Sequence, residues 1–403
     1  MPTATTRPGR ATTRPDPAPA VRSNPCQRLT PEALKAFGAE IEAIRRDVEA
    51  KVGAEDVRHV KRVDAFSRTM EVIGRVLIHV SPEPVSFLAG VTALWLHKQL
   101  QATEVGHTAL HGAFDGLPGA ERFQSKTFRW DTPIDEESWD EGHNKRHHPF
   151  TNIAGKDPDI HFGPVRLTDD TPFRAHHKGQ LPFTLFFLWP NFGFLMNLHF
   201  SGLNDFYFGN DRTEGGMDFL PDRSRESAVK AHKRALRKYL PHYAKEYLFF
   251  PALAGPFFWK VMLGNWLAAT MRDVYSAITI YCGHIGGDVA AYPEGTRPRG
   301  PGAWYAMQVE SANDFEVPLP VSMLCGALDL QIEHHLFPRL PTNRLREIAP
   351  RVRAACERHG VRYRSDSWGR TLAKALRQIA RLSQPQPGEA AVPLGVAAGA
   401  VAA

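Results

Sequence analysis

Histidine clustering is the feature of this sequence that most restricts how the chain can fold. The chain has 403 residues and 18 histidines, and eight of these histidines lie in four short segments between residues 107 and 335. A fold that uses these histidines together must bring distant parts of the chain to one place.

The first two segments have the spacing of metal ligands on helices. His107-Thr-Ala-Leu-His111 places two imidazoles four residues apart, so both lie on one helical face and can converge on one metal ion. In the second segment, His143-Asn-Lys-Arg-His147-His148, His143 and His147 share a face, and His148 is turned away by about 100°.

The third segment is Gln331-Ile-Glu-His334-His335. Gln331 precedes the two histidines by three and four residues, so all three side chains can face one centre. His284 is the fourth candidate, although a single histidine in an apolar run more often has a structural role. Neutral imidazole suits iron, copper, zinc and nickel, and eight imidazoles exceed the coordination shell of one ion. The histidines therefore indicate two metal ions.

Composition excludes several other kinds of site. The four cysteines form no CxxC pair, which argues against a disulfide scaffold, a zinc ribbon and an iron–sulfur cluster. The chain has 49 basic and 43 acidic residues, and its net charge of +6 is too small to indicate nucleic acid as a partner.

Apolar periodicity predicts an all-α fold. Residues 30–48 begin with a Thr-Pro cap and place apolar side chains every three or four positions, as an amphipathic helix does. Similar patterns predict helices over residues 342–360, with Gly360 as the stop, and over residues 368–379. No alternating strand pattern of comparable strength appears.

The two ends of the sequence differ from the rest. Residues 1–29 are rich in Pro, Arg and Thr, and residues 384–403 consist mainly of Pro, Ala and Gly. Neither segment has enough large apolar side chains to order itself, so we expect two disordered tails around one domain of residues 30–383.

Apolar stretches in this domain are typical of a membrane protein. Residues 179–204 carry no charged side chain and exceed the roughly 20 residues that a spanning helix needs. A basic block over residues 223–245, with eight Lys or Arg and one acid, is typical of a helix on an anionic cytoplasmic leaflet or of a solvated helix face. The mean hydropathy of −0.32 is low for a polytopic protein, which leaves a soluble helical enzyme as the alternative.

Taken in order, HTALH, HNKRHH and QIEHHLFP resemble the three-box signature of the membrane fatty acid desaturase and hydroxylase superfamily. Residues 151–160 and 340–363 are also similar to the bacterial acyl desaturase branch, so the resemblance covers about residues 60–365. It implies an integral membrane helical domain, with a cytosolic helical cap that holds a non-haem diiron site.

The resemblance also implies roles for individual residues. The iron ligands would be His107, His111, His143, His147, His148, His284, His334 and His335. Gln331 stands where many members have a further histidine and would be a ligand or a neighbour of the ligands, and Ile280 replaces an Asn of the animal acyl-CoA desaturases. Imidazole ligands need acceptors that fix their tautomers, and the candidates are Asp115, Asp140, Asp157 and Glu333.

The activity that the resemblance implies is fatty acyl desaturation, with two iron ions and with O2 as co-substrate. The sequence has no HPGG haem-binding signature and no ferredoxin cysteine pattern, so we expect electrons from a separate ferredoxin or flavin-linked reductase.

Three alternatives stay open at this point. A lipid hydroxylase, ketolase or epoxygenase uses the same boxes, and a non-catalytic zinc-binding membrane protein could also use the histidines. A soluble carboxylate-bridged diiron enzyme needs two Glu-x-x-His pairs, and only Glu104 to His107 has that spacing.

Membrane topology has two solutions, because the boxes must all reach one centre on the cytosolic side. One makes residues 179–204 a span, returns through residues 247–271 and leaves the basic block outside. The other, which we favour, lays residues 179–204 along the membrane interface and keeps the basic block cytoplasmic. It builds two helical hairpins, over about residues 66–103 with a turn at 81–84, and from Glu246 to His284 with a turn near Gly264 and Asn265.

Overall fold

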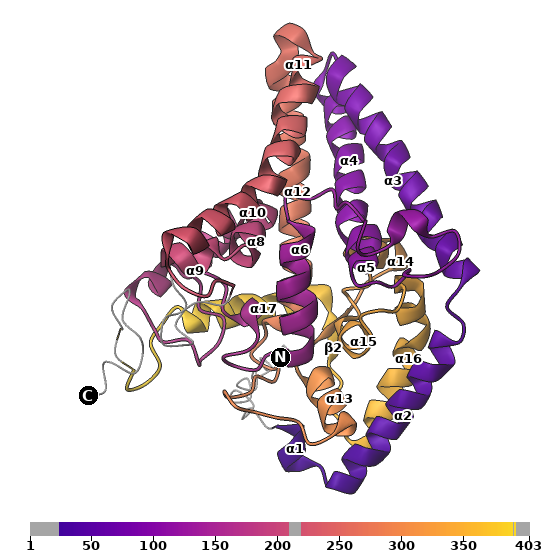
Figure 1. Ribbon diagram of the computed structural model, residues 1–403, viewed down its shortest axis with the longest axis vertical. Helices are drawn as coiled ribbons and strands as arrows, with labels where there is room; N and C mark the ends of the chain where they lie inside the picture. The colour runs from indigo at the N-terminus through magenta and orange to yellow at the C-terminus, as the bar shows by residue number, and fades with distance from the viewer. Residues whose placement is uncertain (1–23, 209–218, 390, 392–403) are drawn as a thin grey trace, which may run out of the picture.

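The computed structural model describes residues 24–208, 219–389 and 391, and the described chain is almost entirely helical (Figure 1). Two strands of three residues each, β1 (Asp314–Glu316) and β2 (Ser365–Ser367), pair in parallel. The predicted all-α fold class is therefore confirmed.

The longer helices are α2 (Pro31–Glu49), α3 (Ala54–Val80), α4 (Pro84–Leu100), α8 (Phe192–Phe200), α10 (Arg225–Ala244), α12 (Phe258–His284), α13 (Pro301–Glu310), α16 (Thr342–His359) and α17 (Trp368–Leu382). The shorter ones are α1 (Pro25–Arg28), α5 (Thr108–Leu110), α6 (Glu136–Trp139), α7 (Gln180–Phe183), α9 (Leu203–Phe208), α11 (Phe250–Ala252), α14 (Leu319–Cys325) and α15 (Gln331–Leu336).

A first helical hairpin consists of α3 and α4, which lie side by side and meet at residues 81–83 (Figure 1). Pro84 begins α4, and the Glu83 carboxylate caps it by accepting hydrogen bonds from the backbone N–H groups of Val85 and Ser86. This hairpin and its turn agree with the prediction.

The second hairpin differs from the prediction in its turn. Its first arm follows α10 and consists of the π-helical turn Lys245–Phe249 with α11, and its second arm is the continuous α12. The chain reverses at residues 253–257, where Gly255 has a φ of +52°. Gly264 and Asn265 lie inside α12 because they serve helix packing. A Cβ atom on Gly264 would approach the Ile78 side chain to 2.8 Å.

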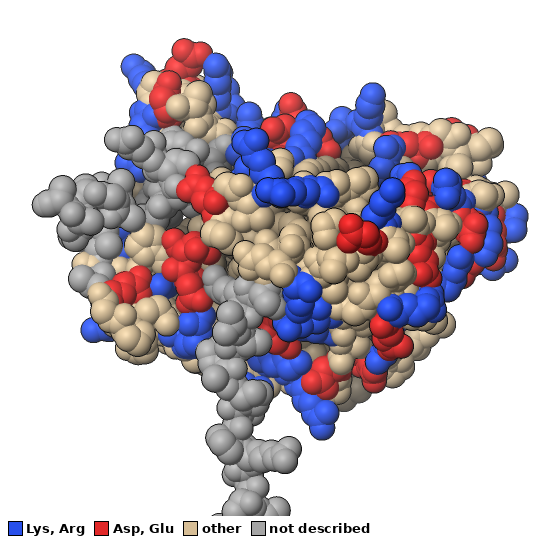
Figure 2. Space-filling view, turned by 90° about the horizontal axis from the view of Figure 1, so that it is seen from below, with Lys and Arg blue, Asp and Glu red and all other residues tan. Residues whose placement is uncertain are grey.

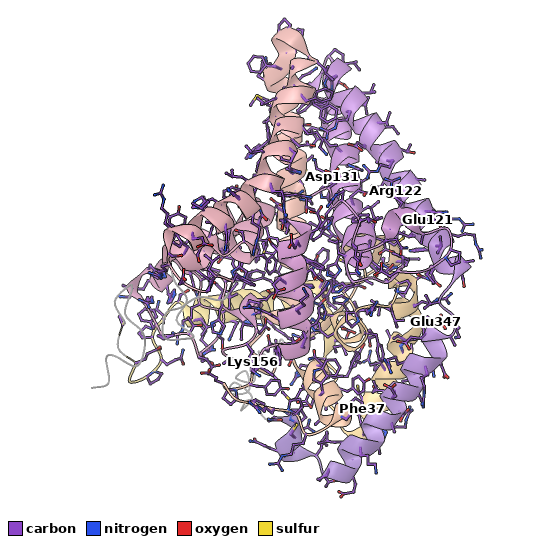
Figure 3. The ribbon with its side chains drawn as sticks, in the orientation of Figure 1. Phe37, Glu121, Arg122, Asp131, Lys156 and Glu347 are labelled. Atoms are coloured by element: carbon purple, nitrogen blue, oxygen red, sulfur yellow. The ribbon has the colours of Figure 1, made fainter. Side chains whose placement is uncertain are left out.

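Polar side chains join the two hairpins internally. Arg75 of α3 donates to Glu246 at 2.6 Å and to the Asn265 side chain at 2.8 Å. Lys245 forms an ion pair with Asp131 at 2.6 Å. Asp131 is labelled among these helices in Figure 3. Buried charges are therefore matched across the hairpins.

Figure 1 shows the two hairpins converging at one end of the molecule, which we call the apex. The helices of the apex expose large apolar side chains, including Val72, Val76, Val80, Val85, Leu88, Leu248, Leu253, Phe257, Trp259 and Trp266. So many exposed large apolar side chains on neighbouring helices are typical of contact with an apolar environment.

The opposite end, which we call the cap, contains the helices that periodicity predicts. The Thr30 hydroxyl caps α2, and Gly360 ends α16 in the left-handed conformation. These two helices pack on each other and on α13. The predicted helices of residues 30–48, 342–360 and 368–379 are therefore confirmed.

The apolar segment from Ala175 to Phe200 is the one described segment that is long and apolar enough to cross a membrane. It is not one straight helix, because a π-helical turn at Thr184–Leu188 and Pro190 interrupt it. It packs against the lower half of α12, where Trp189 and Tyr281 lie 5.4 Å apart, while Phe186 remains 80% exposed.

The basic block forms most of α10. Part of its charge is used inside the protein, because Arg237 pairs with Asp135 and Glu137, and Lys238 pairs with Glu136. The solvated-face interpretation is therefore wrong for Lys238, which is mostly buried, whereas Arg237 pairs with α6 and stays 55% exposed.

The predicted tails lie mostly outside the described residues. Within the described part, the tail boundary differs from the prediction, because residues 25–28 form α1, which packs against α13. At the other end, the Glu389 carboxylate pairs with Arg166 at 3.0 Å.

Candidate metal centre

Four helical segments carry the clustered histidines to one place at the junction of apex and cap. Two of them are π-helical, namely Gln101–His107 and Asp140–His147. A π-helical turn changes the direction of the following side chains and is frequent at functional sites. The other two segments are the last turn of α12 and helix α15.

The first group of imidazoles, cluster A, consists of His107, His111, His143, His148 and His334. One ring nitrogen from each of His107, His111, His143 and His334 lies within 4.8 Å of the other three. The Nε2 atom of His148 lies 3.2 Å from Nε2 of His143 and joins the same group.

The second group, cluster B, consists of His147, His284, His335 and Gln331. The three imidazoles again have ring nitrogens within 4.8 Å of one another. The Gln331 amide lies 2.5 Å from Nε2 of His284 and 3.5 Å from Nε2 of His335. Gln331 thus occupies a position in the cluster equivalent to that of an imidazole.

The two clusters are adjacent. The rings of His148 and His335 stack with their centroids 4.6 Å apart, and the rings of His148 and His147 are 5.4 Å apart. All eight predicted histidines therefore converge, and they form two neighbouring sets of donors.

The donor sets fit metal ions. The Nε2 atoms of His147 and His334 are buried and have no hydrogen-bond partner, as is expected of nitrogens that coordinate an ion. Burial lowers the pKa of His107 to about 3, so this imidazole is neutral and able to coordinate at pH 7.

His147 is the exception in its charge. Burial acts to lower its pKa, but the Asp157 and Asp159 carboxylates outweigh burial and raise the pKa to about 9. An ion that binds to His147 therefore displaces a proton.

One loop supplies hydrogen-bond partners for cluster B. The Asp157 carboxylate accepts a hydrogen bond from Nδ1 of His147 at 3.0 Å, and the Thr151 hydroxyl lies 3.0 Å from Nδ1 of His335. Asn152, between them, has a φ of +55° and donates from its side chain to the carbonyls of Ala290 and Ser311. This loop fixes the orientation of two imidazoles.

Three other predicted acceptors serve different contacts. Asp115 accepts hydrogen bonds from the backbone and hydroxyl of Ser125, and Asp140 accepts from Asn144. Glu333 accepts from the Tyr363 hydroxyl at 3.2 Å. Among the described hydrogen bonds, none joins the carboxylates of Asp115, Asp140 or Glu333 to a clustered imidazole.

Sequence reasoning missed three residues at the site. Thr151 and Asn152 carry no metal-ligand signature, although a short polar run directly after His148 is a usable signal. Trp139 lies one turn before His143, stacks on its ring at 4.5 Å and also contacts His107 and His111.

Glu104, the acid of the isolated Glu-x-x-His pair, plays no part in the centre. Glu104 is buried and forms an ion pair with Arg346 at 2.8 Å, together with hydrogen bonds to His59 and Thr342. The carboxylate that a soluble diiron bundle needs is therefore committed elsewhere.

A narrow, mainly apolar cavity meets both clusters. It follows one face of α12 from His284 past Ile280 and Ser276 to Asp273. At 1.5 Å per residue, this face extends roughly 16 Å from the histidines. Its other walls include Trp130, Thr132, Ile134, Trp139, Phe192, Gly193 and Met196. A linear apolar chain fits this shape.

Comparisons with known proteins agree with these features. A family model described as fatty acid desaturase matches residues 82–367. The NADPH-dependent stearoyl-CoA 9-desaturase of Mycobacterium tuberculosis is 31% identical over 362 residues, which are 89% of this chain and 82% of that protein. The sn-1 linoleoyl-lipid 6-desaturase of Synechocystis sp. is 24% identical and covers 70% of this chain and 77% of its own length. Delta(5) fatty acid desaturase A of Dictyostelium discoideum is 25% identical and covers 69% of this chain and 58% of its own length.

Proposed function

The chain belongs to the fatty acid desaturase family and is an enzyme of that type, and we propose that clusters A and B hold the two iron ions of its reaction centre. The observation that supports this most directly is the meeting of two separate imidazole groups at the head of one acyl-sized cavity. A single metal ion would leave one of the groups unused.

Bound iron would supply the oxidising chemistry by which O2, two electrons and two protons become two water molecules while two hydrogens leave adjacent methylene groups. The residues of the chain provide the conditions for that chemistry. Asp157 and Thr151 hold His147 and His335 with one ring nitrogen turned toward the centre.

The cavity would place one C–C bond of the acyl chain beside the clusters. Ile280, one turn before His284, gives this part of the wall an apolar surface. Gly193 lets α8 pack closely at this wall, because a Cβ atom there would approach Pro133 to 3.0 Å and Asp273 to 3.1 Å. Trp139 closes the wall against the imidazoles and excludes water.

Gln331 would act as a ligand of the second ion through its amide oxygen. The O and N atoms of an amide are assigned from their hydrogen bonds, and here the amide faces two imidazole nitrogens at 2.5 and 3.5 Å. If the amide oxygen of Gln331 faces cluster B, it and the three imidazoles form a set of four donors.

We further propose that the two hairpins lie in a membrane with the histidine boxes on the cytosolic side. The exposed apolar side chains of the apex support this placement, and the interrupted segment 175–200 would lie along the interface. Arg272 and Asp273 are accommodated because they pair at 2.6 Å inside the protein. The chain would then be a multi-pass membrane protein.

The substrate would be a long-chain fatty acyl thioester, by analogy with the stearoyl-CoA 9-desaturase relative, and NADPH would be the ultimate source of electrons. Electrons would reach the centre from a ferredoxin or a flavin-linked reductase. The test is expression in a host that lacks the activity, followed by mass spectrometry of its fatty acids. A new monounsaturated acid is expected, whereas a hydroxylated or epoxidised acid would favour the other chemistries of these boxes.

Metal analysis separates the enzyme from a non-catalytic zinc protein. Iron in the purified chain and oxygen-dependent turnover are expected. A chain that binds zinc and neither consumes O2 nor alters lipids would overturn the proposed centre.

A further inference from the structure

A groove on the cap has no part in the reaction described above. It lies between α2 and the segment 297–305, which leads into α13. We call it the α2–α13 groove. Its lining includes Leu29, Lys35, Ala39, Arg297, Arg299 and Tyr305.

The rim of the groove carries unbalanced positive charge. Lys35, Arg297 and Arg299 are exposed, and within the described chain their side chains form no ion pair or hydrogen bond. The one acid of the lining, Glu42, already pairs with Arg45 and accepts a hydrogen bond from the Tyr305 hydroxyl at 2.8 Å. An occupant of this groove is therefore expected to be acidic.

Only one helix separates the groove from cluster A. On one side, α13 lines the groove with Ala303 and Tyr305. On the other, Trp304 donates a hydrogen bond to the Pro149 carbonyl at 3.3 Å, and Gln308 donates to the His148 carbonyl at 3.1 Å. The intervening layer is about 10–12 Å thick, the diameter of a helix.

Helices α2 and α13 pack closely at the groove. Gly38 of α2 and Gly302 of α13 meet backbone to backbone, and a Cβ atom on Gly38 would approach the Gly302 Cα to 2.6 Å. Because the rate of electron transfer falls steeply with distance, a donor has to bind where the protein layer over the metal centre is thin.

We propose that the α2–α13 groove is the docking site for an acidic electron-carrier protein, and that electrons reach cluster A through Trp304, Pro149 and His148. This inference rests on the proposed diiron function. In each cycle two reduced carriers would each lose one electron. These two electrons, two protons, and the two hydrogens removed from adjacent methylene groups of the acyl chain would together reduce O2 to two water molecules.

The position of the groove argues against a membrane as its occupant. Figure 1 shows α1, α2 and α13 at the end of the molecule opposite the apex. Figure 2 views this end directly and shows a surface of uncharged residues bordered by both basic and acidic side chains. The unpaired basic side chains of the groove lining are Lys35, Arg297 and Arg299. A basic rim turned away from the membrane is available to a soluble partner.

The experiment compares the double variant Arg297→Glu/Arg299→Glu with Arg370→Glu/Arg377→Glu, a control on exposed residues of α17. The probe is an acidic plant-type [2Fe–2S] ferredoxin, and the purified full-length chain is used in detergent. Three quantities are measured: the Kd for oxidised ferredoxin, the KM for reduced ferredoxin, and turnover driven by a chemical reductant.

We expect the groove variant to raise Kd and KM at least tenfold and to reduce their dependence on salt, with chemically driven turnover and iron content unchanged. The control should behave like the unaltered chain. Equal ferredoxin affinity in both variants would overturn the docking site. The docking site would also be overturned if the groove variant lost binding to anionic vesicles but kept its affinity for ferredoxin. Absence of iron and of chemically driven turnover in the unaltered chain would instead overturn the proposed function.

Discussion

Asp157 and His147 are joined by a hydrogen bond of 3.0 Å between the carboxylate and Nδ1 of the ring. The other oxygen of the carboxylate accepts from the backbone N–H of Asn152 at 2.7 Å. The link therefore ties a proposed iron ligand to a loop that is anchored elsewhere in the cap, and it leaves Nε2 of His147 free to coordinate.

Asp157→Asn tests this link. The amide keeps the shape but removes the negative charge that orients and polarises His147, so iron affinity should fall about 10- to 100-fold, as is usual for such outer partners. Iron per chain and the rate of desaturation measure the effect. Asp115→Asn is the control, because Asp115 bonds only to the Ser125 region among the described hydrogen bonds, and it should retain both properties.

His335→Ala removes a ligand from cluster B. Turnover should be abolished and iron should fall from two ions to about one, while circular dichroism shows unchanged helix content. His232→Ala, at a histidine that bonds to Tyr207 away from both clusters, should leave activity unchanged. Desaturation at the normal rate by the His335 variant would exclude this residue as a ligand.

Gln331 can be tested by replacement in two directions. Gln331→Ala removes a donor from cluster B and should lower iron occupancy and activity, whereas Gln331→His should restore a donor and retain iron. If both variants hold two iron ions as tightly as the original chain, Gln331 has no coordinating role.

Asn152 combines an unusual backbone conformation with two side-chain hydrogen bonds. Asn152→Gly preserves the positive φ and loses only the hydrogen bonds, whereas Asn152→Ala also meets the conformational cost of about 1–2 kcal/mol. Thermal unfolding should therefore show that the original chain is the most stable, the Gly variant less stable and the Ala variant the least stable. An Ala variant more stable than the Gly variant would contradict the backbone argument.

Topology is tested with single cysteines in a chain without Cys26. A cysteine at Arg234 should react with an impermeant reagent only from the cytosolic side of sealed vesicles. A cysteine at Leu253, in the turn between α11 and α12, should react only from the opposite side. Labelling of both positions from one side would contradict the hairpin.

The sequence allowed prediction of the features that depend on local spacing. The apolar repeats of α2 and α16 needed no information about distant residues, and the convergence of the histidines followed from their order and spacing. The first hairpin was also predictable, because Pro84 marks the start of α4 after a short polar turn.

Features that depend on distant neighbours were not predictable. Gly264 and Asn265 have the composition of a turn, but Ile78, Arg75 and Glu246 determine their role inside α12. Glu333 adjoins His334 in the chain, yet its carboxylate turns to Tyr363 from a segment 30 residues away. The π-helical turns that aim His107 and His143 have no recognisable sequence pattern.

The most direct test of the proposed centre is an iron count on the purified chain, by elemental analysis, together with a parallel assay of fatty acyl desaturation. Two neighbouring donor sets predict close to two iron ions per active chain. Full activity with a single iron ion per chain, or with zinc alone, would contradict the assignment of clusters A and B as one diiron centre.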